Sequence, residues 1–239
     1  MIKLKCKYGK SVVMDIKAVI LDFGGTLSDG ALDWEPYHET IRSFLLSHGY
    51  SMPMKDLKKS LRGAIAHLNR VRAKGKEMHF EDVYALFLED MGVQYDREML
   101  EYLHDNFRNH YNTHFYPCAE SVLQELSSKY KVALLSNTMS DQPRRLIESA
   151  GLTKYFDVIY CSRELGVRKP NKAAFKVVLN ELKVNPGETV HVGDSVEADM
   201  YGARDSGITG VWVKTPDQPL WNGHAISSIC DLPWFLETL

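Results

Sequence analysis

Residues 18–29 read A-V-I-L-D-F-G-G-T-L-S-D, and the rest of the chain is organised around this stretch. A short apolar run, 18–21, ends at an acid, Asp22, which two glycines and a threonine follow. An apolar run of this length that stops at glycines is typical of a buried strand in a parallel sheet. In open sheets of that kind, ligands bind beyond the carboxyl ends of the strands. The sequence therefore places Asp22 at an edge where chemistry is usually done.

The residues after Asp22 suit the binding of an anion. Gly24 and Gly25 let the backbone turn sharply and bring N–H groups close to a phosphate, and Thr26 adds a hydroxyl. Asp22 is then a carboxylate nucleophile or a metal ligand beside a phosphate cradle. A plain strand followed by a glycine turn is the alternative, and this stretch alone does not separate the two.

Composition excludes several classes of protein. The chain has 239 residues, of which 44% are hydrophobic and 25% charged, as in ordinary globular proteins. This length allows one large α/β domain or a core with an inserted lobe. A net charge of -2 gives no reason to expect a nucleic acid as partner. No apolar run approaches the roughly 18 residues of a membrane span, and no export signal is evident, so we expect a cytoplasmic protein.

The four cysteines, Cys6, Cys118, Cys161 and Cys230, are scattered and form no C-x-x-C pair. We expect them to be reduced structural residues of an intracellular protein, neither a disulfide framework nor a zinc site.

A change of pattern divides the chain. Residues 1–15 precede the first strong strand, here 16–22, and are a possible N-terminal extension. After it come four amphipathic helical patterns without a strand-like run, at 37–48, 55–74, 81–91 and 97–111. Four such helices in series can bury a common apolar stripe as a small bundle. We therefore predict an inserted helical cap at 34–112, joined by linkers near 33–36 and 112–116.

From residue 117 the pattern alternates between strands and helices. Strands are predicted at 131–135, 156–161, 189–192 and 210–213, and helices at 119–129, 141–150, 171–182 and 197–206. Such alternation produces parallel β-α-β units with right-handed crossovers. Residues 1–33 and 113–239 are thus predicted to form an α/β core, a Rossmann-like, doubly wound parallel sheet.

Polar residues follow several of the predicted strands. Asp22 is joined by Ser136 and Asn137, by Asp194 with Asp199, and by Lys169 ahead of a helix. Each has a structural alternative as a turn former, a helix cap or a solvated charge. Their coincidence at strand ends favours a shared site.

Together these motifs resemble the haloacid dehalogenase-like hydrolases. They read D-F-G-G-T (22–26), L-L-S-N (134–137), R-K-P-N-K-A-A-F (168–175) and H-V-G-D-S-V-E-A-D-M-Y-G-A (191–203). The helical insertion is similar to the cap that this family places after its first strand. The resemblance covers nearly all of residues 16–213.

The resemblance implies a Mg²⁺-dependent phosphohydrolase that acts on a small phosphorylated metabolite, as a monomer or homodimer. Asp22 would attack phosphorus and form an aspartyl-phosphate, with Lys169 balancing the negative charge. Phosphate contacts are implied for Gly24, Gly25, Thr26, Ser136, Asn137 and Lys169. Metal ligation is implied for Asp22, the carbonyl of Gly24 and Asp194, while Asp199 would support the metal shell or orient Lys169.

Gly24 departs from the family pattern, because phosphatases of this family usually carry a second Asp there that protonates the leaving group. The substrate then has a good leaving group, or Asp29, Asp33, Glu35 or His38 supplies the proton, or the activity is weakened to phosphate binding. The alternative reactions are 2-haloacid dehalogenation, which needs no metal, and phosphonate cleavage, which needs a cap lysine such as Lys55, Lys58, Lys59, Lys74 or Lys76.

Substrate choice is expected to lie in the cap. Arg62, His67, Asn69, Arg70 and Arg72 either reach a polar substrate or form an exposed helix face. Trp34 and Tyr37 either close over the site or pack at a hinge.

Overall fold

The computed structural model describes residues 15–216 and 219–239, so the possible extension up to residue 14, together with Cys6, lies outside the described residues. The strands are β1 (Ala18–Leu21), β2 (Ser28–Leu32), β3 (Tyr111–Phe115), β4 (Lys131–Ser136), β5 (Val158–Cys161), β6 (Thr189–Gly193), β7 (Thr209–Val213) and β8 (His224–Ile226). The longer helices are α1 (Trp34–Ser47), α2 (Met54–Arg72), α3 (Phe80–Asp90), α4 (Arg97–Asn109), α5 (Ala119–Lys129), α6 (Gln142–Ser149) and α8 (Lys172–Leu182). Shorter elements are α7 (Ser162–Leu165), α9 (Gly202–Asp205), α10 (Leu232–Leu236), η1 (Thr153–Tyr155), η2 (Pro186–Glu188), η3 (Val196–Tyr201) and η4 (Ile229–Asp231).

The core is a six-stranded sheet in the order β5-β4-β1-β6-β7-β8, and every neighbouring pair is parallel. The strand that carries the deciding stretch, β1, lies in the interior of this sheet between β4 and β6. Strand order therefore reverses on either side of β1, which is where open α/β sheets bind ligands. The prediction of a doubly wound parallel sheet is confirmed.

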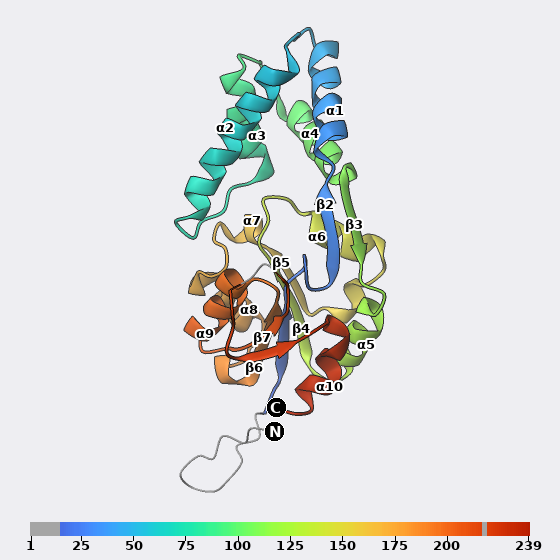
Figure 1. The fold of residues 1–239 in the computed structure, drawn as a ribbon, viewed down its shortest axis with the longest axis vertical. Helices are drawn as coiled ribbons and strands as arrows, with labels where there is room; N and C mark the ends of the chain where they lie inside the picture. Colours follow the sequence, from blue (N-terminus) through green and yellow to red (C-terminus); the bar gives the residue numbers. More distant parts are fainter. Residues whose placement is uncertain (1–14, 217–218) are drawn as a thin grey trace, which may run out of the picture.

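Both faces of the sheet are covered, as the unbroken apolar run of β1 predicts. Val19 and Leu21 pack into one cluster with apolar side chains of α5 and α10. Ala18 and Ile20 point to the other face and pack with α8 and α9. All four side chains are fully buried. The core thus has three layers, with β1 sealed in the middle one (Figure 1).

Helices α1 to α4, hereafter the helical block, form a separate apolar cluster that includes Tyr37, Leu57, Phe80 and Leu103. Figure 1 shows the block standing above the carboxyl end of the sheet. Polar and glycine residues delimit its helices, for example Asp96, whose carboxylate accepts the Met99 N–H at 2.9 Å to cap α4. No helix within 15–216 or 219–239 has the length and apolar character needed to cross a membrane.

A two-stranded antiparallel ribbon connects the block to the core (Figure 1). β2 pairs with β3 from Ser28–Phe115 to Leu32–Tyr111. The predicted linker near 33–36 is wrong, because α1 begins at Trp34. The predicted linker near 112–116 overlaps β3, one of the two strands of this ribbon. The segments S-D-G-A-L and Y-N-T-H-F carry few apolar residues, so neither resembles a strand until the two are paired.

The loop between α2 and α3 makes a second attachment between block and core. The Arg168 N–H donates to the carbonyl of Gly75 at 3.2 Å, and the Glu77 N–H donates to that of Gly166 at 3.0 Å. The Phe80 N–H donates to the carbonyl of Met139 at 2.9 Å. The block is thus held both by the ribbon and by this loop.

The expectation that the cysteines are unpaired is wrong for two of them. Cys118 and Cys230 form a disulfide across 112 residues of sequence, whereas Cys161 is free and buried. Cys118 directly precedes α5 and Cys230 lies in η4, just before α10. These two helices pack together against one face of the sheet, which brings the sulfur atoms within bonding distance. The spacing of the cysteines in the sequence could not predict this pairing, because the pairing depends on how the two helices pack.

Candidate active site

Asp22 lies just beyond β1 and faces a buried ammonium group. Lys169 Nζ is 2.9 Å from Asp22 Oδ1 and 2.6 Å from Asp199 Oδ1. The Lys169 and Asp199 side chains are almost completely buried, whereas Asp22 keeps 14% of its side chain exposed. The structure therefore brings three of the predicted residues into one charged cluster and leaves only Asp22 partly open.

Asn137 fixes the position of Lys169 through its backbone. The Asn137 side-chain amide donates to the carbonyl of Lys169 at 2.9 Å, and its Oδ1 accepts the Lys169 N–H at 2.9 Å. Asn137 directly follows β4, the neighbour of β1. This pair of hydrogen bonds ties the segment before α8 to the end of the sheet.

Protein groups surround both carboxylate oxygens of Asp199. Oδ1 contacts Lys169 and also His191 Nε2 at 2.9 Å, while Oδ2 accepts the Ser195 N–H at 3.0 Å. The His191 Nδ1 lies 3.1 Å from the carbonyl of Ile20. Asp199 belongs to η3, a π-helical turn that stands where an ordinary helix from residue 197 is predicted. Of the two implied roles for Asp199, this geometry favours orienting Lys169.

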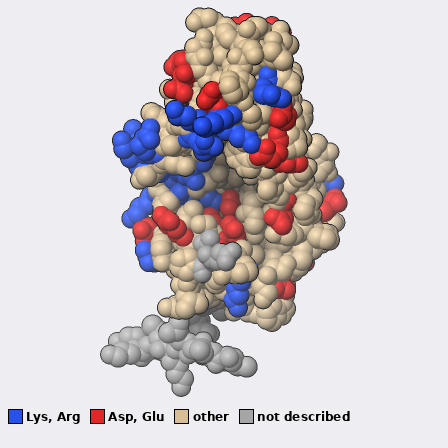
Figure 2. Space-filling view, turned by 45° about the horizontal axis from the view of Figure 1, so that its top comes forward, with Lys and Arg blue, Asp and Glu red and all other residues tan. Residues whose placement is uncertain are grey.

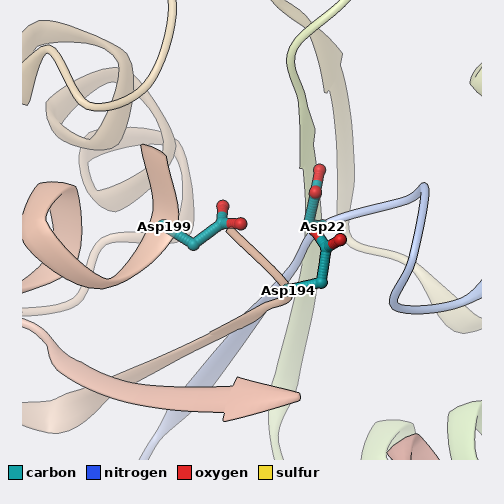
Figure 3. Close-up of side chains that lie close together, drawn as sticks. All are labelled: Asp22, Asp194 and Asp199. Atoms are coloured by element: carbon teal, nitrogen blue, oxygen red, sulfur yellow. The ribbon is translucent and has the colours of Figure 1, made fainter. Parts of the chain in front are cut away.

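Asp194 completes the acidic cluster. One oxygen each from Asp22, Asp194 and Asp199 lies within 4.8 Å of the others. Figure 3 shows the Asp199 carboxylate pointing toward those of Asp22 and Asp194. A Cβ at Gly25, whose φ is +68°, would collide with the carboxylate of Asp194. Glycine at this position therefore lets the turn after β1 lie directly against Asp194.

Crowding of negative charge changes the protonation of these groups. Burial raises the pKa of Asp194 to about 7, and the charges of Asp22 and Asp199 act in the same direction. Burial also raises the pKa of Asp22, although Lys169 opposes this shift. Burial works against the charged forms of Asp199 and Lys169, but their mutual attraction outweighs it, so the pKa of Asp199 is lowered and that of Lys169 raised.

The donor set fits a divalent cation. Three carboxylates share one lysine, so the cluster is short of positive charge, and the charges of Asp22 and Asp199 add to burial in raising the pKa of Asp194. Oxygen ligands of this kind suit Mg²⁺, which keeps several waters and needs few protein groups. Asp22 and Asp194 retain carboxylate oxygens that could accept such an ion.

A cavity of about 570 Å³ opens above Asp22, between the core and the helical block. Figure 2 shows the hollow between the two parts, with Lys and Arg gathered along one side. Its wall includes, from the core, Asp22, Phe23, Gly24, Ser136, Asn137, Thr138, Met139, Gln142 and Pro143. From the ribbon and block it includes Ser28, Gly30, Ala31, Leu32, Trp34, Ile65, Leu68, Arg72, Phe107, Tyr111 and Thr113.

The turn after Asp22 differs from the implied phosphate cradle. The Gly25 N–H donates to the carbonyl of Ser28 at 2.8 Å, and the Thr26 N–H points to that of Phe23 at 3.4 Å. Thr26 is fully buried and does not line the cavity. In this structure Gly25 and Thr26 therefore close the turn itself, while Gly24, Ser136 and Asn137 face the cavity.

A family model for haloacid dehalogenase-like hydrolases matches residues 16–207, which include every element of this cluster. The chain belongs to that family. The resemblance drawn from the motifs is thereby confirmed.

Several relatives within the haloacid dehalogenase-like hydrolases are phosphatases. Phosphoserine phosphatase of Thermus thermophilus is 35% identical over 136 residues, which is 56% of this chain and 53% of that protein. Human N-acylneuraminate-9-phosphatase is 31% identical over 126 residues, or 50% and 51%. This chain thus spans about half the length of both. Glyceraldehyde 3-phosphate phosphatase of Methanothermobacter thermautotrophicus is 24% identical over 237 residues, or 94% and 100%.

Solved structures of haloacid dehalogenase-like hydrolases share the whole fold. A 2-haloacid dehalogenase from Pseudomonas syringae superposes with a TM-score of 0.68 at 23% identity, covering 93% of this chain and 99% of the other. A phosphatase from Thermococcus onnurineus gives 0.62 at 24% identity, covering 92% and 98%. Identities this low show the fold alone.

The four residues predicted to replace the missing acid do not line the cavity. None of Asp29, Asp33, Glu35 and His38 is among its described lining residues. None of the five candidate cap lysines is among the described lining residues either.

The residues of the block that were predicted to contact substrate fall into two groups, those that line the cavity and those that do not. Arg72 and Trp34 line the cavity, whereas Arg62, His67, Asn69 and Arg70 do not. Tyr37 is fully buried and its hydroxyl donates to that of Tyr84 at 2.7 Å, so it packs the block.

Two site residues escaped prediction. His191 holds Asp199 from within β6, where it reads as one more residue of a buried strand. Glu77 contacts Arg168 beside Lys169, yet it comes from a loop of the block. All of β6 is buried, so a histidine within this strand offered a signal for His191, because a buried histidine needs a polar partner. Nothing in the sequence marked Glu77.

Proposed function

We propose that the protein is a Mg²⁺-dependent phosphohydrolase that acts on a small phosphorylated metabolite through an aspartyl-phosphate on Asp22. One observation carries this proposal: a partly open Asp22 contacts a buried Lys169 at 2.9 Å, within a cluster of three carboxylates. A scaffold without chemistry would gain nothing from burying such charges. The phosphatase relatives support the same reaction class.

The first step is displacement at phosphorus. A carboxylate oxygen of Asp22 attacks, the bond from phosphorus to the ester oxygen breaks with its electron pair going to that oxygen, and the leaving oxygen takes a proton from water. Lys169 offsets the charge that Asp22 and the phosphoryl group bring together. Ser136 and Asn137 line the cavity beside Asp22, where they can donate hydrogen bonds to phosphoryl oxygens.

The second step is hydrolysis of the aspartyl-phosphate. Water attacks phosphorus, the bond to Asp22 breaks, and inorganic phosphate leaves with Asp22 restored. Splitting the reaction in this way replaces one difficult displacement by two easier ones. Bound Mg²⁺ would act as a Lewis acid on the phosphoryl oxygens. Asp22, Asp194 and the carbonyl of Gly24 would hold it, while Asp199 keeps Lys169 in place.

The substrate should carry a good leaving group, because Gly24 provides no acid to protonate the departing oxygen. General acid catalysis typically contributes about 10²–10⁴ in rate. Acyl phosphates and other esters with acidic alcohols need little of this help. We therefore expect faster turnover of such substrates than of simple alkyl phosphates.

The test is phosphate release from a panel of small phosphate esters and acyl phosphates, with Mg²⁺ and with a chelator. Metal-dependent turnover that Asp22→Asn abolishes supports the proposal. Asp205→Asn, a matched change at an exposed residue of α9, serves as the control and should leave turnover intact.

A second candidate, hydrolysis of 2-haloacids, is favoured by Gly24, since the family's dehalogenases also lack the second Asp. Asp194 weighs against it, because a metal-free reaction gains nothing from that crowded carboxylate. Halide release from 2-chloropropionate that persists with a chelator, without phosphate release from any ester, would replace the first proposal by this one.

A further inference from the structure

Arg72 brings a positive charge to the wall of the cavity that the helical block forms, whereas Asp22 belongs to the wall formed by the core. Asp22 follows β1 of the core, whereas Arg72 is the last residue of α2 in the block. These two are the only charged residues among the described residues that line the cavity. A guanidinium in a mostly apolar wall attracts an anion strongly, because little water competes for it.

Helical spacing explains why Arg72 faces the cavity. Ile65, Leu68 and Arg72 are separated by three and four residues, so they lie on one face of α2. All three line the cavity. Arg70, on the same helix, is exposed and lies outside the lining.

The buried carboxylate of Glu77 holds Arg72 in place but is shared with a second guanidinium group. Arg72 Nε donates to Glu77 Oε1 at 2.9 Å, and Arg168 Nη1 donates to Glu77 Oε2 at 3.0 Å. Ser162 Oγ also donates to Oε2, at 3.0 Å. The Glu77 side chain is fully buried, and it faces two guanidinium groups. One carboxylate therefore faces two guanidinium groups at this edge of the cavity, so it cannot neutralise both.

We propose that Arg72 binds a second anionic group of the substrate, so that the preferred substrates are phosphate esters that also carry a carboxylate or a second phosphoryl group. This inference rests on the proposed function. The phosphoryl group under attack already has Lys169 beside Asp22, so the guanidinium on α2 is left for the distal part of the ligand. Its planar fork matches the two oxygens of a carboxylate or phosphate.

The test compares substrates that differ only in the second anion. 3-Phosphoglycerate against glycerol 3-phosphate tests a carboxylate, and fructose 1,6-bisphosphate against fructose 6-phosphate tests a second phosphoryl group. Wild type should show a higher kcat/KM for the doubly anionic member of at least one pair. In Arg72→Gln that ratio should fall by about 10- to 100-fold, the value of a hydrogen bond to a charged group.

Two control variants sharpen the result. Arg70→Gln removes a neighbouring charge from the exposed face of α2 and should leave the ratio unchanged. Arg72→Lys keeps the charge but loses the planar fork, so its ratio should fall between those of wild type and Arg72→Gln. An equal fall in kcat/KM for both members of each pair, or no preference in wild type, would overturn the inference.

Binding measurements separate this inference from the proposed reaction. Calorimetry on Asp22→Asn and on Asp22→Asn combined with Arg72→Gln measures affinity for 3-phosphoglycerate and glycerol 3-phosphate without turnover. A preference for 3-phosphoglycerate that depends on Arg72 supports the inference even if wild type hydrolyses no ester. Equal affinities in both proteins would overturn it, whatever the activity.

Discussion

Position 24 has open space beside it. A Cβ at Gly24 would meet nothing within 4 Å, so a side chain can start there without a clash at its first atom. We expect Gly24→Asp to speed hydrolysis of alkyl phosphates by about 10²-fold, because it supplies the missing general acid. Steady-state phosphate release measures this. Gly24→Asn, which fills the same space without a proton to give, is the control, and an equal gain in both variants would refute the explanation.

The shifted pKa of Asp194 predicts how metal and pH act on stability. Its pKa is about 7 in the folded chain against 3.8 ordinarily, so the folded state binds a proton more readily than the unfolded state between these values. Stability without metal should therefore fall as pH rises from about 4 to about 7. Added Mg²⁺ should raise the melting temperature more at pH 8 than at pH 5, because protons then no longer compete for Asp194.

Melting curves in chelator and in Mg²⁺ at several pH values test this directly. Asp194→Asn should lose both the Mg²⁺ effect and part of the pH dependence seen for wild type. The explanation fails if the variant keeps the same dependence on both.

Site residues differed in how far sequence could reveal them. Asp22, Ser136 and Asp194 could be predicted because each lies at the carboxyl end of a strand of one parallel sheet or directly after it, and such strand ends meet at one edge. Arg72 was predicted only as one of several alternatives, because its role depends on which face of α2 meets the core. Glu77 could not be predicted, since its partners Arg168 and Ser162 lie about 90 residues away.

Among the elements, the ribbon of β2 and β3 is where a single methyl group should matter most. A Cβ at Gly30 would collide with the carbonyl oxygen of Asn112 on β3 and lie 2.7 Å from the Cα of Thr113. Gly30→Ala should therefore loosen the pairing and lower the melting temperature by several degrees. Gly187→Ala is the matched control, because its Cβ would meet nothing within 4 Å. Equal melting temperatures for the two variants would contradict the close approach.

Elements with a strong apolar pattern were predicted well and those without one poorly. The helices of the block and the strands of the main sheet have strong apolar patterns, because one or both of their faces are buried. β2, β3 and β8 bury few side chains, so their pairing partners rather than their own residues make them strands. The π-helical form of η3 was also missed. It accompanies contacts of Asp199 with His191 and Lys169, which lie outside this element.

At the scale of the whole molecule, the Cys118–Cys230 bridge links α5 to the end of the chain. Closing a loop of this length restricts the unfolded chain, and such bridges stabilise proteins by about 2–5 kcal/mol. Reductant should therefore lower the melting temperature of wild type but not that of the double variant Cys118→Ser with Cys230→Ser. Mass spectrometry of a digest made without reductant should recover the two cysteines in one linked pair of peptides. Recovery of both as free thiols would contradict the bridge.

The double attachment of the helical block also has a consequence for the speed of ligand entry. A block joined by the ribbon alone could swing freely, but here the loop between α2 and α3 must first release its hydrogen bonds to Gly166, Arg168 and Met139. Opening then becomes a separate step that precedes encounter, so the observed association rate should level off as ligand concentration rises. Stopped-flow fluorescence of Trp34, which lines the cavity, can follow this. The height of the plateau would give the opening rate itself, which sets an upper limit on turnover if the block closes in every cycle.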